Sequence, residues 1–185
     1  QINPHFLFNT LNNIYALIGI SQTRAQSAVH DLSKLLRYAL YEGNKEKVLL
    51  ESELQFVRNY LELMSLRLSD TVKLQVNIPV DTSNLYIAPM LFITLVENAF
   101  KHGVVKSGNS FINIEIKAID GVVECNISNS VSMLVNSITD KSGIGVENLK
   151  KRLNLIYPDR YSYEYTNKDS VYYAKLKIVL KNDKA

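Results

Sequence analysis

The sequence TVKLQVNIP, residues 71–79, marks the point at which the repeat of apolar residues changes. Its apolar residues alternate with polar ones: Val72, Leu74, Val76 and Ile78. Such a period of two indicates a β-strand with one buried face, which Pro79 ends. Upstream, apolar residues recur every three or four positions and glycine is scarce. The sequence therefore predicts two regions, a helical one over residues 1–70 and a mixed one over residues 71–185.

Three helices are predicted in the first region, over residues 4–20, 24–41 and 51–68. In the first, one side is expected to be apolar: Leu7, Leu11, Ile14 and Ile18. At about 100° per residue this places His5 and Asn9 on the opposite side. The other two helices carry similar seams: Ala25, Ala28, Leu32, Leu35 and Ala39, then Leu54, Val57, Leu61, Met64 and Leu68. Because each seam lasts only about two heptads, a hairpin or a dimeric bundle is predicted.

The second region is predicted to mix strands and helices. Strands are expected over residues 71–78, 111–118, 122–127, 161–166 and 171–180, and helices over 90–105 and 146–156. Residues 130–142 have no clear period, and a connection of that length is typical of a mobile lid. Mixed strands with helices on one face predict an α+β two-layer sandwich with a mixed sheet.

The composition excludes several classes of protein. With 46% hydrophobic residues the chain can bury a core, so disorder is excluded. A net charge of only +3 gives no case for a nucleic-acid-binding protein. The single Cys125 cannot form an internal disulfide, which favours a reducing compartment. No stretch reaches the roughly 18 apolar residues of a membrane span, and because the chain begins at Gln1 we expect an upstream part to be missing.

The sequence QINPHFLFN, residues 1–9, contains a candidate nucleophile. Asn3 followed by Pro4 is a typical helix start, so His5 is predicted in the first turn. There the positive end of the helix dipole disfavours the imidazolium form, and attack on phosphorus requires a neutral ring. Asn9, one turn later, is positioned to orient that ring by a hydrogen bond. Helical geometry alone favours a surface histidine, and the case for a nucleophile depends on the two segments that follow.

Two further segments contain groups suited to a nucleotide. LVENAFKHG, residues 95–103, places four polar side chains on one helix face: Glu97, Asn98, Lys101 and His102. Amide and carboxylate oxygens suit Mg²⁺ and its waters, and lysine suits phosphate. A solvated face with a Glu97–Lys101 pair is the alternative. In SGIGVENL, residues 142–149, Gly143 and Gly145 precede a helix whose N-terminus favours phosphate, although a plain turn explains two glycines as well.

Together the three segments resemble LytS-type sensor histidine kinases, whose catalytic domain belongs to the GHKL ATPase superfamily. QINPHFLFN is similar to the family's phosphoacceptor box, VENAFKHG to its N box, and GIGVENLKKRL to its glycine box. The resemblance implies a Bergerat-type sandwich with ATP held between the N-box helix and a lid. It implies that His5 is phosphorylated, that Asn98 holds Mg²⁺, and that Glu97 supports the metal water or the reacting phosphate. Lys101 and His102 would then line the nucleotide, and Gly143 and Gly145 would shape the lid.

The sequence departs from the family pattern in one segment. Where the family has Asp-x-Gly after the central strand, this chain has Asn129, Ser130 and Val131. The Asp of the family accepts a hydrogen bond from the adenine amino group. A neutral amide oxygen still accepts it, and we expect the contact to weaken by about 1 kcal/mol. An acid directly after the phosphorylated histidine, present in many other histidine kinases, is replaced here by Phe6.

The resemblance also implies partners. His5 would pass its phosphoryl group to an aspartate of a response regulator, in a homodimer anchored to the inner membrane by upstream segments, with the present part in the cytoplasm. Because His5 must reach the ATP, we expect a hinge at Asp70–Thr71. Two alternatives are a degenerate nucleotide-binding or scaffolding module, suggested by Asn129 and Val131, and another GHKL ATPase such as an anti-sigma-factor serine kinase.

Overall fold

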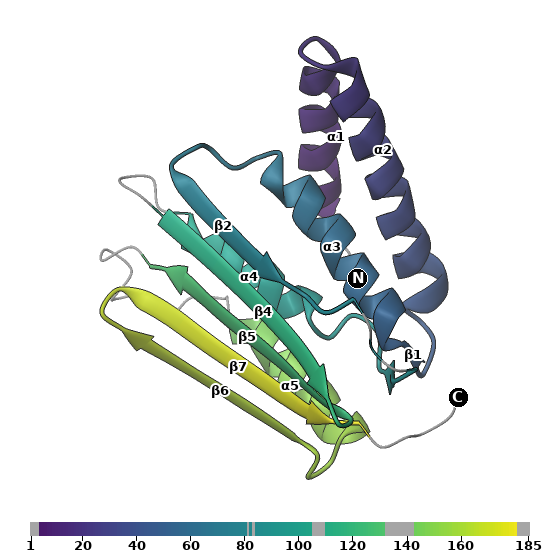
Figure 1. The fold of residues 1–185 in the computed structure, drawn as a ribbon, viewed down its shortest axis with the longest axis vertical. Coiled ribbons are helices and arrows are strands. Elements are labelled where there is room, and N and C mark those ends of the chain that lie inside the picture. The colour runs from purple at the N-terminus through teal and green to yellow at the C-terminus, as the bar shows by residue number, and fades with distance from the viewer. Residues whose placement is uncertain (1–3, 81, 83, 105–109, 132–142, 181–185) are drawn as a thin grey trace.

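The computed structural model of the chain describes residues 4–80, 82, 84–104, 110–131 and 143–180. It consists of a helical hairpin and a two-layer sandwich in which helices lie on one face of a five-stranded sheet (Figure 1). The hairpin and its continuation comprise α1 (Pro4–Ile18), α2 (Gln22–Arg37), a π-helix, η1 (Tyr38–Glu42), and α3 (Leu50–Ser65). No helix among the described residues is long and apolar enough to cross a membrane.

The sheet has the order β2-β4-β5-β7-β6. Its strands are β2 (Val72–Asn77), β4 (Ser110–Ile119), β5 (Val122–Ser130), β6 (Tyr161–Lys168) and β7 (Val171–Val179). Only β2 and β4 pair in parallel, because the chain between them crosses the sheet through α4 (Ile93–Gly103). Short strands β1 (Val48–Leu49) and β3 (Tyr86–Ile87), which the sequence pattern does not predict, pair with each other. The predicted α+β class and mixed sheet are confirmed.

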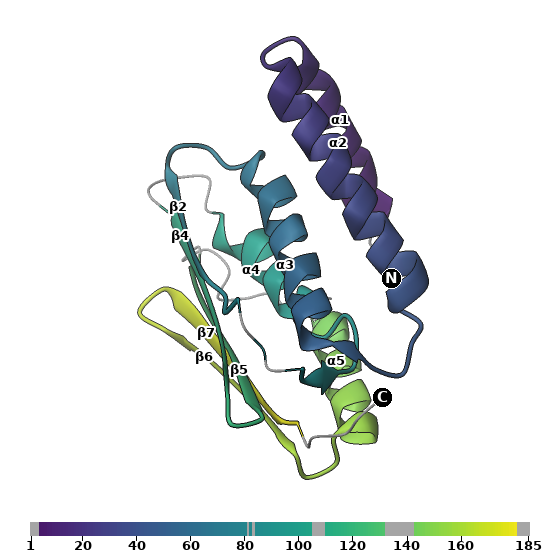
Figure 2. The ribbon, with the colours of Figure 1, turned by 45° about the vertical axis from the view of Figure 1, so that its right-hand side comes forward.

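Helices α3, α4 and α5 (Gly143–Ile156) cover the same face of the sheet, and α1 and α2 lie beyond α3 (Figure 2). Because α3 lies between the hairpin and the sandwich, it is buried on more than one side. Even its polar residues Glu53 and Asn59 are buried. Buried apolar residues of the hairpin and of the sandwich form one connected core. The division at residue 70 stays a prediction, and α3 packs with both regions.

The apolar side predicted for α1 coincides only in part with its buried side. Its buried residues are Phe6, Thr10, Ile14 and Leu17, whereas Leu11 and Ile18 are exposed. The helix has apolar residues on most of its circumference, so their spacing alone does not select one side. The seams of α2 and α3 are confirmed, with Ala39 and Leu68 half-buried and the other residues buried.

Candidate functional site

A cavity of about 290 Å³ lies between α3, α4 and α5. Its lining comes from segments that are far apart in the sequence: Gly43, Phe56, Tyr60, Met90, Ile93, Thr94, Glu97, Gly145, Asn148, Leu149 and Arg152. Two of the residues predicted from the sequence, Glu97 and Gly145, therefore line the same cavity. Asn98, Lys101, His102 and Asn129 do not line it, although α4 carries the first three within five residues of Glu97.

Glu97 is half-buried on α4, and burial raises the pKa of its carboxyl group. An ion pair between Glu97 and Lys101, expected of a solvated helix face, is not among the ion pairs of the described residues. Lys101 instead extends into solvent, while Asn98 and His102 are half-buried. The partly desolvated Glu97 carboxyl is thus available to a ligand in the cavity.

The N-terminus of α5 meets the first turn of α4. Gly143 is the first residue of α5, and Gly145 lies two residues further along the helix. A Cβ atom on Gly145 would stand 3.5 Å from Cγ2 of Thr94, an ordinary contact distance. Backbone N–H groups at the start of α5 therefore lie beside the cavity, where a helix N-terminus favours an anion. Of the predicted lid, residues 130–142, the part from residue 132 to residue 142 lies outside the described residues.

Asn129 is fully buried on the inward face of β5, the central strand of the sheet. The strand continues to Ser130, three residues beyond the predicted end, and pairs Asn129 with Ile112 and Tyr172. Its Nδ2 donates to the carbonyl of Ser130 over 2.9 Å, whereas its Oδ1 has no hydrogen-bond partner among the described residues. A buried acceptor without a partner costs about 1–3 kcal/mol, so this oxygen is a candidate for binding a ligand.

The C-terminal end of α4 lies directly over Asn129. A Cβ atom on Gly103 would stand 2.9 Å from Cβ of Asn129 and 3.0 Å from Cγ1 of Ile112. The hydroxyl of Ser130 donates to the carbonyl oxygen of Gly103 over 3.3 Å. Glycine at this position therefore brings the helix that carries Glu97 and Asn98 against the strand that carries Asn129.

His5 is exposed in the first turn of α1, as predicted. Nδ2 of Asn9 lies 3.1 Å from Nδ1 and 3.3 Å from Nε2 of the ring. A hydrogen bond donated by this amide would hold the ring in one orientation. The predicted cap, Asn3, lies outside the described residues.

The residue that follows His5 packs against the wall of the cavity. The ring of Phe6 stacks on that of Tyr60, with centroids 4.8 Å apart and planes 24° apart. Tyr60 in turn meets Phe100 of α4 edge to face, with centroids 6.5 Å apart. Burial, and then the Glu97 carboxylate, raise the pKa of Tyr60. Phe6 is therefore separated from the cavity by one ring, that of Tyr60.

Sequence reasoning missed four residues of this region: Tyr60, Thr94, Gly103 and Arg152. Arg152 was detectable, because it follows Gly145 by seven residues and so lies on the same helix face. Tyr60 lies within an ordinary apolar seam, so nothing in its spacing distinguishes it. Gly103 was quoted with its segment, but its role depends on a strand 26 residues away.

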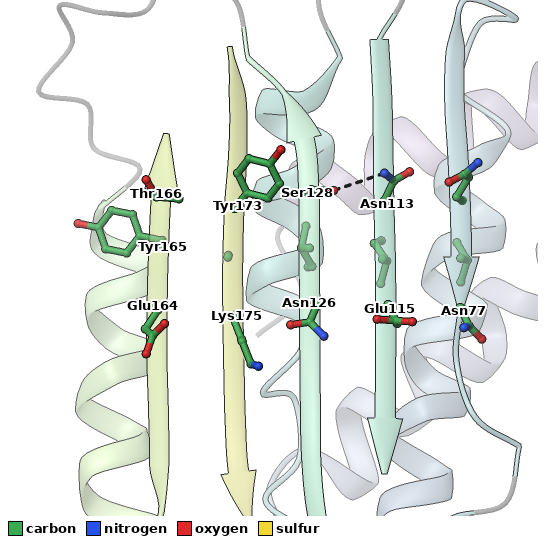
Figure 3. Close-up of a pocket in the computed structure, with 15 residues that line it drawn as sticks. Asn77, Asn113, Glu115, Asn126, Ser128, Glu164, Tyr165, Thr166, Tyr173 and Lys175 are labelled. Atoms are coloured by element: carbon green, nitrogen blue, oxygen red, sulfur yellow. Dashed lines mark hydrogen bonds between the residues drawn. The ribbon is translucent and has the colours of Figure 1, made fainter. Parts of the chain in front are cut away.

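A larger hollow of about 630 Å³ lies on the face of the sheet opposite α4. Figure 3 shows its polar side chains, among them Asn77, Asn113, Glu115, Asn126 and Lys175. None of the residues predicted to act on a nucleotide lines it. Size alone therefore does not identify the site, and the chemistry favours the smaller cavity beside α4 and α5.

Comparison with known proteins finds histidine kinases. A histidine kinase family model matches residues 1–72. Sensor protein kinase HptS of Staphylococcus aureus is 39% identical over 103 residues, which are 56% of this chain and 20% of HptS. This chain thus matches about a fifth of the length of that relative.

Solved structures show the same fold. The histidine kinase domain of a blue-light activated histidine kinase from Erythrobacter litoralis has a TM-score of 0.53 at 14% identity, covering 90% of this chain and 80% of that chain. ShkA, solved in complex with AMPPNP, has a TM-score of 0.52 at 15% identity, covering 87% of this chain and 38% of ShkA. The chain thus resembles histidine kinases in the sequence of residues 1–72 and has the fold of a histidine kinase domain.

Proposed function

We propose that this chain transfers the γ-phosphoryl group of Mg–ATP to His5. One observation carries the proposal: the cavity with Glu97 and the N-terminus of α5 also borders Tyr60, on which Phe6 stacks. The turn that carries the candidate phosphoacceptor therefore packs, through Phe6, on a residue that lines the candidate nucleotide site. ShkA, similar in fold, binds a nucleotide analogue, which supports the same assignment.

The described residues suit the parts of ATP. The start of α5, with Gly143 and Gly145, would hold the phosphates, as helix N-termini do. The unpartnered Oδ1 of Asn129 fits the adenine amino group, which needs an acceptor. Lys101 and His102 would line the nucleotide from the second half of α4. These assignments follow the family resemblance and stay proposals.

Mg²⁺ would enter with the nucleotide. The described residues include no group of three or more His, Cys, Asp or Glu side chains placed to hold a metal. Mg²⁺ does not require one, because it commonly uses one or two protein ligands together with phosphate oxygens and water. Asn98 would provide such a ligand and Glu97 would hold a metal-bound water, while the metal would offset phosphate charge.

The transfer requires little of the protein beyond positioning and charge. A lone pair of the neutral His5 ring attacks the γ-phosphorus, the bond to the bridging oxygen breaks, and ADP leaves. The phosphorylated ring then loses its remaining N–H proton to water, because His5 is exposed. Asn9 would hold the ring in place before the transfer, and this hydrogen bond would break as the accepting nitrogen attacks the phosphorus.

The remaining steps extend beyond this chain. We propose a response-regulator aspartate as the next acceptor, because HptS is a sensor protein kinase. A second copy is proposed to cover the exposed apolar side of α1. Membrane anchoring through segments outside this chain stays a prediction.

The proposal is tested by incubating the chain with Mg²⁺ and γ-labelled ATP. We expect an acid-labile label that disappears in His5→Gln, with Gln26→Asn, an exposed position on α2, as a matched control. Acid-stable label that persists in His5→Gln would favour another GHKL ATPase. Nucleotide binding without any label would favour a degenerate module, for which the buried neutral Asn129 is the specific argument.

A further inference from the structure

Phe6 attaches the turn that carries His5 to the rest of the molecule, and the half-buried Leu7 also packs against the core. His5 itself is exposed, and among its neighbours on α1 the first buried residue is Phe6. Phe6 is 6% exposed and Tyr60, its stacking partner, is 4% exposed. Stacked aromatic pairs contribute about 0.5–1.5 kcal/mol beyond the area that they bury. This pair therefore fixes the first turn of α1 on α3.

Tyr60 connects that turn to the helix of the nucleotide site. Its ring meets Phe100 at 82°, and Phe100 lies three residues after Glu97 on α4. Tyr60 and Glu97 also line the same cavity. The contacts thus run from Phe6 through Tyr60 to α4, and all three rings belong to one chain.

We propose that the Phe6–Tyr60–Phe100 contact is the positioning device that holds His5 at the nucleotide cavity of its own chain. This inference rests on the proposed phosphotransfer. Phe6, which occupies the place of the acid in many other histidine kinases, would act by packing, with no role in moving protons. Phosphoryl transfer depends steeply on such placement, because the reacting atoms must approach to about 3–3.5 Å.

Measuring the rate of autophosphorylation distinguishes a role of Phe6 in positioning His5 from a role in stabilising the fold. Phe6→Ala is expected to lower the rate at saturating ATP by about tenfold or more while the KM for ATP stays unchanged. Phe6→Tyr and Tyr60→Phe, which keep the stacked rings, should retain most of the rate. The matched control is Ile14→Ala, because Ile14 is equally buried on α1 at 5% exposure but lies two turns away from His5.

Two results would overturn the positioning role. One is an equal loss of rate in Phe6→Ala and Ile14→Ala, which would mean that the ring only stabilises the hairpin. The other is a loss in Phe6→Ala that appears as a raised KM, which would place Phe6 in nucleotide binding. If the unmodified chain is not labelled at all, the proposed function itself fails, and the two failures are thereby distinguished.

The placement within one chain has its own test. His5→Gln and Asn98→Asp chains, each confirmed to be unlabelled alone, are co-expressed with different tags and purified as mixed dimers. We expect no label on either chain. Label on the Asn98→Asp chain, whose His5 would then be served by the partner's cavity, would overturn the placement. If the chain is monomeric, the rate constant of autophosphorylation is measured at several protein concentrations. A constant value supports the placement of His5 at the cavity of its own chain, and a value that rises with concentration contradicts it.

Discussion

At the scale of single residues, the contact between Gly103 and Asn129 sets how close the nucleotide helix lies to the central strand. A Cβ atom on Gly103 would stand 2.9 Å from Cβ of Asn129 and 3.0 Å from Ile112, both inside the sheet layer. Neither neighbour is the end of a flexible chain, so α4 would have to move outward. The distance between α4 and Asn129, whose Oδ1 is the proposed adenine contact, would then increase.

We therefore expect Gly103→Ala to lower the free energy of unfolding by about 1–3 kcal/mol, as overpacking does. The affinity for an ATP analogue, measured by titration calorimetry, should fall severalfold at the same time. Gly19→Ala is the control, because a Cβ atom there meets only one atom, at 3.9 Å. An unchanged affinity in Gly103→Ala would remove Asn129 from the proposed adenine site.

At the scale of helices and strands, Glu53 joins three elements. Its buried carboxylate accepts hydrogen bonds from the hydroxyl of Tyr38 in η1 over 2.5 Å and from the backbone N–H groups of Met90 (2.8 Å) and Leu91 (3.0 Å) just before α4. Burial raises the pKa of Glu53 above its ordinary 4.5, and the hydrogen bonds oppose that rise. The segment leading into α4 is thus tied to α3 and to the end of the hairpin.

The raised pKa makes a prediction about stability. Because the folded state holds the Glu53 proton more tightly than the unfolded state, its contribution is present below pH 4.5 and is lost as pH rises through the folded value. As the pH rises above 4.5, the free energy of unfolding, measured by urea titration, should therefore decrease less steeply with pH in Glu53→Gln than in the unmodified chain. Equal slopes would show that Glu53 does not titrate in this window.

Removing the carboxyl tests the bonding itself. Glu53→Ala leaves the backbone N–H groups of Met90 and Leu91 and the Tyr38 hydroxyl without their acceptor, and each such group costs about 1–3 kcal/mol where it is buried. We expect a loss of about 3 kcal/mol or more, larger than that of Glu53→Gln. A smaller loss would mean that water replaces the missing oxygens.

At the scale of the whole molecule, one side of α1 lacks a partner in the described part of the chain. It carries large apolar residues spaced three and four apart, with these exposed fractions: Phe8 65%, Leu11 47%, Tyr15 80% and Ile18 57%. This spacing is the one by which helices pack in bundles. A second copy of the hairpin, packed as in a four-helix bundle, is the occupant that we propose.

Leu11→Glu with Tyr15→Glu should therefore shift the chain toward monomers in sedimentation equilibrium, because two carboxylates would be buried in the interface. Asn12→Glu, exposed on the same helix, is the control and should leave the distribution unchanged. Unchanged dimers in the double variant would place the interface elsewhere.

The elements of the sandwich were predictable because their periods are clear. The strand at residues 71–78 and the helix at 146–156 were both found within a few residues of β2 and α5. The strand over 122–127 was predicted too short, because Ser128, Asn129 and Ser130 are polar although β5 includes them. The two-residue strands β1 and β3 are too short to produce a pattern at all.

By itself the sequence determined the α+β class, the resemblance to histidine kinases and the residue types of the candidate nucleotide site, because periodicity and local motifs are local properties of the chain. It did not determine which side of α1 faces inward, that Gly103 presses on Asn129, or that Phe6 meets Tyr60. Those contacts join residues separated by 26 to 54 positions. Only the packing of α3 and α4 in the folded chain brings these residues together. Several faces of a helix can have the same spacing of apolar residues, and the tertiary structure determines which face is buried.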